Sequence, residues 1–190
     1  MKVRVARTLA LLGVVASATV FAQIPTVPPG NSPAKAKELV GLLTTKKLES
    51  FVVREGSEAG RYVAILLVPN VQLLLVAATY ERPNDIEYYV YNKTPMNAYQ
   101  DLRSSVLSKK RVFIEDVFCD GLVPQPAKGQ AVMDTVTVET EKTVFDGIFA
   151  DPKKKDPKKI SLEDYTKNFT AADDRYSRLL GLLLDELKKS

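Results

Sequence analysis

Two neighbouring runs of apolar residues constrain the fold of this chain more than any other feature. Residues 62–68 and 71–79 are apolar at almost every position, so neither run has a polar face. Pro69 and Asn70 lie between them, where proline can occupy the first turn position and asparagine can adopt a positive φ angle at the second. We therefore predict a hairpin of central strands, shielded on both faces by helices, a second layer or a second subunit.

Three helices are predicted around this hairpin. Ser-Pro at 32–33 and Thr-Pro at 94–95 each place an N-cap residue before a proline, which starts helices that run to about Thr45 and about Leu107. Ser161 is expected to cap a long C-terminal helix, because apolar residues then recur every three or four positions to the end of the chain. Residues 83–93 fit both helix and strand patterns, and we favour helix.

Further strands are predicted on both sides of the central hairpin, over residues 51–53, 111–118, 134–139 and 142–145. Strands and helices that are not in strict alternation favour an α+β fold. We expect a single α+β domain over residues 32–190, with an antiparallel sheet of about five or six strands flanked by helices and a long C-terminal helix.

The N-terminus carries the features of a secretory signal peptide over residues 1–22. Lys2, Arg4 and Arg7 precede an apolar run from Thr8 to Phe21, which is shorter than a membrane span needs. A flexible proline-rich lead is predicted for residues 23–31. The sequence therefore predicts an exported protein of a bacterium, periplasmic or secreted, with no membrane span.

Charge gives no reason to expect a nucleic-acid partner. The chain has 27 Lys and Arg against 23 Asp and Glu, and three of the basic residues leave with the signal peptide. The remaining net charge is close to zero, so neither an acidic nor a basic partner is favoured. Residues 151–159 contain five lysines diluted by two aspartates, and we interpret them as a solvated connector.

The absence of histidine excludes many catalytic and metal sites. Without it the chain has no Ser-His-Asp or Cys-His catalysis and no imidazole ligand for zinc or haem. We also expect little change in stability between about pH 6 and 8, where histidine titrates. Cys119 is the single cysteine, and Asp116 and Asp120 beside it should raise its pKa, so we interpret it as a core residue and not a nucleophile.

Carboxylates at strand ends are the remaining candidates for chemistry: Glu115, Asp116, Asp120, Asp134 and Asp146. Aspartates are common at such positions because they accept hydrogen bonds from nearby backbone amides, and we favour that structural role. The sequence therefore assigns no catalytic, cofactor-binding or metal-binding residue, and no cofactor.

Three segments resemble a group of uncharacterised exported bacterial proteins. They are residues 62–69, the sequence Val-Phe-Asp-Gly at 144–147, and residues 165–176. The resemblance implies no activity and no functional residue.

The leading functional hypothesis is a non-enzymatic binding or assembly module. Its partner would be another protein or a second copy, docked on a sheet face or on the C-terminal helix. A carrier of a small apolar ligand is the first alternative, because of the doubly apolar hairpin. An enzyme that uses carboxylates or a bound metal is the second, and three convergent carboxylates in a cleft would favour it.

Overall fold

The computed structural model describes residues 30–54, 61–80, 95–108, 111–123, 134–139, 141–144 and 162–190. The predicted signal peptide, most of the proline-rich lead, the segment 83–93, the connector 151–159, the cap at Ser161 and the candidate Asp146 lie outside these residues.

The described residues form one antiparallel sheet and three helices, which confirms the predicted α+β fold. The strands are neighbours in the order in which they occur in the chain, so the sheet is a six-stranded meander. Its strands are β1 (Ser50–Arg54), β2 (Tyr62–Val68), β3 (Leu73–Thr79), β4 (Val112–Val117), β5 (Thr135–Val138) and β6 (Glu141–Val144). The helices are α1 (Ser32–Lys46), α3 (Pro95–Ser108) and α4 (Leu162–Lys189).

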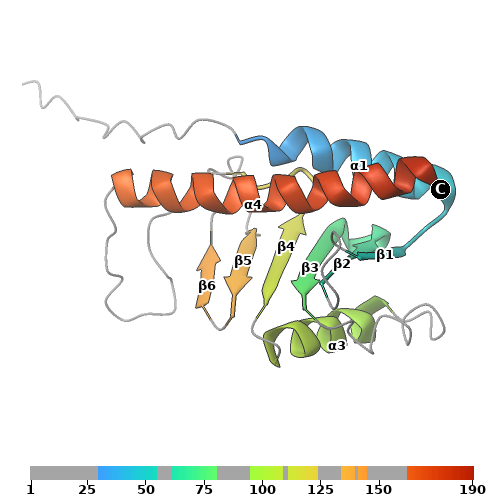
Figure 1. Ribbon diagram of the computed structural model, residues 1–190, viewed down its shortest axis with the longest axis horizontal. Coiled ribbons are helices and arrows are strands. Elements are labelled where there is room, and N and C mark those ends of the chain that lie inside the picture. The colour runs from blue at the N-terminus through green and yellow to red at the C-terminus, as the bar shows by residue number, and fades with distance from the viewer. Residues whose placement is uncertain are drawn as a thin grey trace, which may run out of the picture.

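Helices cover both faces of the sheet, as the doubly apolar hairpin predicted (Figure 1). Side chains such as Ile65, Val76 and Ile114 pack against α1 and α4 on one face. Alternate residues of the same strands, such as Leu75 and Phe113, pack against α3 on the other. Because successive side chains of a strand point to opposite faces, continuous apolar strands require this double cover.

The turn between β2 and β3 differs from the prediction. It is a short 3₁₀ turn, Pro69–Val71, and the residue with a positive φ angle is Gln72 at 49°. Asn70 therefore does not take the left-handed position that its residue type suggested. The turn is longer than two residues because Leu73, the first residue of β3, pairs with Val68, the last residue of β2.

The last helix is part of the core. It packs on the sheet and runs parallel to α1, whose first residues meet Asp173 and whose last, Lys46, meets Ser190. Leu180 is fully buried, which supports the expectation that this broad apolar stripe packs within the molecule. None of the helices in the described part of the chain is long and apolar enough to cross a membrane.

Candidate functional site

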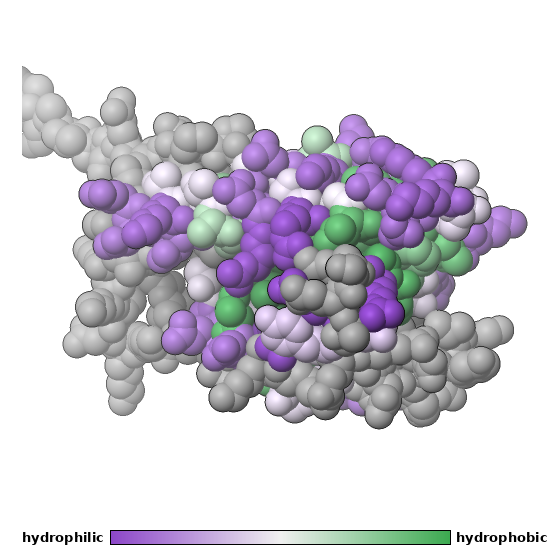
Figure 2. All heavy atoms as spheres, in the orientation of Figure 1, coloured by the Kyte–Doolittle hydropathy of each residue, from purple (hydrophilic) through white to green (hydrophobic). Residues whose placement is uncertain are grey.

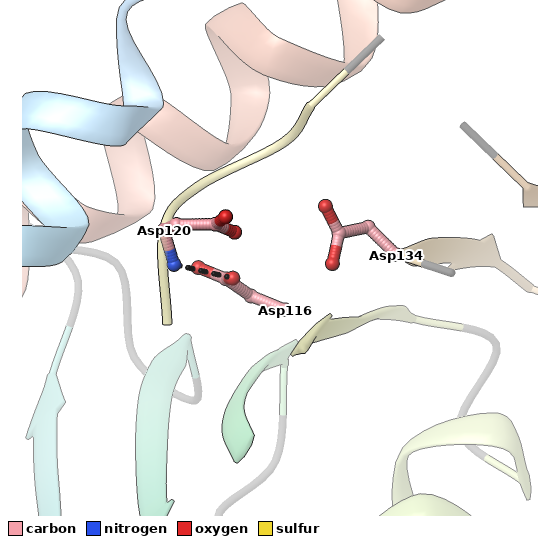
Figure 3. A group of neighbouring side chains, drawn as sticks. All are labelled: Asp116, Asp120 and Asp134. Atoms are coloured by element: carbon pink, nitrogen blue, oxygen red, sulfur yellow. Dashed lines mark hydrogen bonds between the residues drawn. The ribbon is translucent and has the colours of Figure 1, made fainter. Parts of the chain in front are cut away.

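Two places gather groups that could do chemistry, and they lie at opposite ends of β4. The first is a carboxylate cluster at the end of that strand. Asp116 is the last but one residue of β4, Asp120 follows in the turn, and Asp134 precedes β5, the antiparallel neighbour. Phe118 and Cys119 have φ angles of 73° and 60°, which fold the chain back on itself after the strand. Oxygens of the three aspartates lie within 4.8 Å of one another (Figure 3).

The two buried aspartates of this cluster are used by the protein itself. Both oxygens of Asp116 accept hydrogen bonds, from the Tyr176 hydroxyl at 2.7 Å and from the backbone amides of Gly121 at 3.0 Å and Asp120 at 3.1 Å. Asp134 accepts from the backbone amides of Val117 at 2.8 Å and Val123 at 3.2 Å. These bonds hold the loop after β4 against the sheet and against α4.

Burial shifts the pKa of Asp116 and of the neighbouring Cys119. It raises the pKa of Asp116 to about 7, even though the Tyr176 hydroxyl and the backbone amides favour the charged form. Burial also raises the pKa of the Cys119 thiol to about 12, with the charges of Asp116, Asp120 and Asp134 adding to the effect. Cys119 is partly buried, and a raised thiol pKa supports the interpretation that it is not a nucleophile.

Three carboxylates at this spacing are oxygen ligands of the kind that a divalent cation takes. The oxygens of Asp116 and Asp134 already accept backbone or hydroxyl hydrogens, however, and Asp120 is exposed. The arrangement is what the sequence led us to favour, namely aspartates that accept hydrogen bonds from a turn. We assign the cluster a structural role.

A buried aspartate outside this cluster, Asp173, joins α4 to the start of α1. The sequence predicted Ser32 as a local N-cap of α1, and this prediction was wrong, because the N-cap residue is Asn31 and no side chain of that segment caps the helix. Asp173 accepts instead, from the amides of Asn31 and Ser32 and from the Ser32 hydroxyl. The hydroxyl oxygen of Ser32 in turn accepts a hydrogen bond from the backbone amide of Leu122 at 2.8 Å.

Glu115 lies on the opposite face of the sheet from Asp116 and takes no part in the cluster. It accepts hydrogen bonds from the hydroxyls of Tyr99 and Thr135, and it forms ion pairs with Arg103 at 3.1 Å and Lys142 at 3.6 Å. Burial alone would raise the pKa of Glu115, but these partners together lower it below its ordinary value. It links α3 to three strands.

The second place is a pocket of about 250 Å³ at the other end of β4, between the sheet and the middle of α4. Four arginines line it. Arg61 precedes β2, Arg111 precedes β4, and Arg175 and Arg178 come from α4. Among the described lining residues the one acidic side chain is Glu139. Figure 2 shows the hydrophilic surface over the middle of α4.

The floor of this pocket is apolar. Ala78, Val112 and Val138 are register partners across β3, β4 and β5, and they lie on the face that packs against α4. Leu179 completes the floor from the helix. Fixed charges above an apolar floor interact more strongly with a ligand than charges surrounded by water do.

Tyr80 organises two of the four arginines. The guanidinium carbon of Arg111 lies 3.4 Å from the centre of the Tyr80 ring, and that of Arg61 lies 5.2 Å from it. Tyr80 is nevertheless 44% exposed. The ring therefore stacks two cations at the pocket and leaves part of its own surface open.

Sequence reasoning missed this pocket. Its arginines are spread over more than a hundred positions and follow no motif, and the near-neutral composition favoured neither an acidic nor a basic partner. Two sequence features could have indicated it. Arg61 and Arg111 each stand directly before an apolar strand, and Arg175 and Arg178 are three positions apart on the last helix. The sheet register and the packing of α4 on the sheet bring them together.

No family model, no curated protein and no solved structure matches this chain. The resemblance to uncharacterised exported proteins therefore stays a prediction.

Proposed function

We propose that this chain is an exported, non-enzymatic binding module whose ligand is an anion held in the arginine pocket. One observation carries the proposal: four arginines, from the residues before β2 and β4 and from α4, line one pocket, and Glu139 is the one acidic side chain among its described lining residues.

Electrostatics supports an anionic ligand. Arginine stays charged at any ordinary pH, and its planar fork of N–H donors matches carboxylate and phosphate oxygens. Arg175 and Arg178 are exposed, so the helix side of the pocket is accessible from solvent.

The alternatives have less support. A carrier of an apolar ligand would need an apolar cavity, whereas the pocket at the sheet is lined by arginines above a small apolar floor. A carboxylate enzyme would need acids aimed at a substrate, whereas Asp116 and Asp134 bind the backbone of their own loop. Docking of a partner on a sheet face is less favoured than the pocket, because α3 covers one face and α1 and α4 cover the other.

Export is the second part of the proposal. The basic start and the short apolar run of residues 1–22 support it, and they lie outside the described residues. The ligand would then be met in the periplasm or outside the cell. Detection of the mature N-terminus near Gln23 by mass spectrometry of the protein recovered from its own cells tests this part.

Calorimetric titration tests the anion-binding part. The purified mature domain, at low ionic strength, is titrated with sodium citrate, inorganic phosphate and inorganic pyrophosphate, and with spermidine as a cationic probe. We expect at least one anion to bind, with an affinity that falls as salt is added, and spermidine not to bind. Arg175→Gln and Arg178→Gln should each weaken anion binding.

Lys167→Gln is the matched control. Lys167 is an exposed cation of the same helix, roughly 12 Å from Arg175 along its axis at 1.5 Å per residue. This variant changes the net charge by the same amount and should bind as the parent does. Absence of binding by all three anions, or equal loss in the control, would overturn the proposal.

A further inference from the structure

The loop that follows β4, residues 118–123, is held in place by buried side chains. Four of its backbone amides donate to three acceptors: those of Asp120 and Gly121 to Asp116, that of Leu122 to Ser32, and that of Val123 to Asp134. All three acceptors are completely buried. We infer that this loop is a proton-dependent latch, which stays closed while Asp116 carries a proton and opens more readily when Asp116 is ionised. The inference does not depend on the proposed anion-binding function.

The conformation of the loop makes it depend on these acceptors. Phe118 and Cys119 have φ angles of 73° and 60°, values that cost free energy for residues other than glycine. Gly121, at 84°, adopts a positive φ without that cost. A strained turn relaxes when the hydrogen bonds that hold it weaken. Asp116 accepts two of the four amides, so a change in its charge acts directly on the loop.

The ionisable groups that face Asp116 in the described part of the chain are all acids. Oxygens of Asp120, in the turn, and of Asp134, before β5, lie within 4.8 Å of its carboxyl group (Figure 3). The other two groups are the Cys119 thiol in the turn and the Tyr176 hydroxyl on α4. None of them carries a positive charge, and a carboxyl group beside other carboxylates ionises less readily.

The other described elements around Asp116 bring no compensating cation. β3 places Leu74 opposite Asp116 in the sheet. Lys35 of α1 donates to the backbone carbonyl of Ser177 at 3.0 Å, and Asp173 of α4 accepts from α1. Within the described ranges no lysine or arginine forms an ion pair with Asp116. Burial raises the pKa of Asp116 to about 7 without a cation to oppose it, which places the change in charge near neutral pH.

An ionised Asp116 favours the open loop, because water can then solvate its charge. In the closed loop the carboxylate is buried and close to Asp120 and Asp134, and both the burial and the like charges penalise it. In the open loop its pKa returns toward the ordinary value of 3.8. The closed loop therefore keeps a proton that the open loop has lost. Closure is fully favoured below about pH 4, and this advantage is lost as the pH rises toward 7.

The latch is connected to the start of α1. The Leu122 amide donates to the Ser32 hydroxyl at 2.8 Å, and an added Cβ on Gly121 would lie 2.4 Å from the backbone nitrogen of Pro33. The loop backbone therefore packs directly on the first turn of α1. Opening of the loop separates Leu122 from Ser32 and exposes that turn, so uptake of a proton by Asp116 closes the loop over the beginning of the helix.

Hydrogen exchange of the Gly121 amide, followed by NMR on the purified protein between pH 5 and 8, tests the latch. The protection factor is the ratio of the intrinsic to the measured exchange rate at the same pH, so it reports opening alone. We expect it to fall about tenfold per pH unit, or roughly a hundredfold from pH 5 to 7, and to level off above about pH 7. Constant protection of Gly121 from pH 5 to 7 would overturn the inference.

The Val76 amide separates opening of the loop from unfolding of the whole protein. Val76 is fully buried in β3, which has a neighbouring strand on each side, so its exchange reports global unfolding. We expect Gly121 to be at least about tenfold less protected than Val76 at pH 7, and to be unaffected by low urea concentrations that accelerate exchange of Val76. Equal protection and equal urea dependence of the two amides would mean that the loop opens only on global unfolding, and the latch would be rejected.

Two variants assign the proton to Asp116. Asp116→Asn cannot ionise, so the protection of Gly121 should change by less than about threefold from pH 5 to 7. Asp174→Asn is the matched control, because Asp174 is exposed on α4, and it should keep the change seen in the parent. Circular dichroism shows whether each variant is folded. A folded Asp116→Asn protein with the pH dependence of the parent would contradict the assignment.

Tyr176→Phe keeps the inference testable even if Asp116→Asn does not fold. The Tyr176 hydroxyl donates to Asp116 and favours its ionised form, so removing it raises the pKa of Asp116 in the closed loop further. The protection of Gly121 should then continue to fall above pH 7 and level off at a higher pH than in the parent. Levelling at the same pH in both proteins would assign the proton to another group.

Discussion

Asp173 of α4 accepts hydrogen bonds from the backbone amide and the hydroxyl of Ser32, so a residue of the last helix caps the first helix. Both residues are almost completely buried, and 141 positions of sequence separate them. The amides at the start of a helix have no partner within the helix, and a carboxylate placed there also interacts favourably with the helix dipole. This contact therefore fixes the N-terminus of α1 against the turn of α4 that contains Asp173.

A double-mutant cycle measures this contact. Asp173→Ala removes the acceptor of three donors, two of them buried, and we expect a loss of about 2 to 4 kcal/mol in the free energy of unfolding. Ser32→Ala should cost about 1 to 3 kcal/mol, since the Leu122 amide loses its acceptor as well. Urea denaturation of both single variants and the double variant should give a coupling energy of about 0.5 to 3 kcal/mol.

Asp174→Ala is the control for that cycle. Asp174 is the exposed neighbour of Asp173 on α4, and its removal should change stability by less than about 0.5 kcal/mol. Purely additive losses in the Ser32 and Asp173 variants would contradict the capping role.

Two glycines should respond to alanine in opposite directions. Gly121 has a φ angle of 84°, and an added Cβ would lie 2.4 Å from the backbone nitrogen of Pro33, so Gly121→Ala should destabilise the protein by about 2 kcal/mol or more. Gly41 lies within α1 with no atom within 4 Å of an added Cβ. Gly41→Ala should stabilise by about 0.5 to 1 kcal/mol. Thermal and urea unfolding distinguish the two, and a neutral Gly121→Ala would mean that the β4 loop does not pack against α1.

Asp116 should make stability depend on pH between about 5 and 7, a range that overlaps the window of about pH 6 to 8 in which the absence of histidine suggested little change. Its pKa of about 7 in the folded protein is above that of an unfolded aspartate, near 3.8. Between these values the folded state keeps a proton that the unfolded state has lost. The stabilising contribution is therefore complete below about pH 4 and is lost as the pH rises toward 7. The free energy of unfolding should fall by about 2 to 3 kcal/mol between pH 5 and 7 at about 1.4 kcal/mol per pH unit.

Asp116→Asn tests that assignment, because an amide does not titrate. Its free energy of unfolding should be nearly flat from pH 5 to 7, while Asp174→Asn should keep the slope of the parent. Glu115 does not interfere, since its lowered pKa gives a contribution that is lost only as the pH falls through more acidic values. The same slope in Asp116→Asn would assign the proton to another group.

The Cys119 thiol should resist modification in the folded state. Its pKa of about 12 leaves very little thiolate at pH 8, so a disulfide reagent should react at least about a hundredfold more slowly with the native protein than with the unfolded one. Spectrophotometric thiol titration with and without urea measures the ratio, and the chain offers no other cysteine to confuse it. Rapid labelling of the native protein would place the thiol at the surface.

The fold was predictable because its signals are local. An apolar run with no polar face requires cover on both sides, and proline after Thr94 marks the start of α3 whatever the helix packs against. Element boundaries were also close, since β2 spans the predicted residues and α1 ends one residue past the predicted Thr45. The errors arose where a tertiary contact replaced a local one. Ser32 has the chemistry of an N-cap, but its hydroxyl binds Asp173 instead.

The candidate site could not be predicted in the same way. Asp116 and Asp134 were identified as turn-binding carboxylates, and their partners are the backbone amides that this role requires. The arginine pocket depends on the register that places the start of β4 beside the end of β3, and on the turn of α4 that faces them. Overall charge hides such a site, because it averages a local excess over the entire chain.

The parallel packing of α1 against α4 also has a consequence for folding, because α1 can reach its final contacts only when α4 is present. Each strand of the sheet pairs with the strand before it, so the meander can form step by step as the chain becomes available. The first helix does not pack against an element that is adjacent in the chain in this way. The amides at its start are capped by Asp173, which lies 141 positions after Ser32. Closing so long a segment costs entropy before the contact returns any stability. The start of α1 can therefore be capped by Asp173 only after α4 has been synthesised.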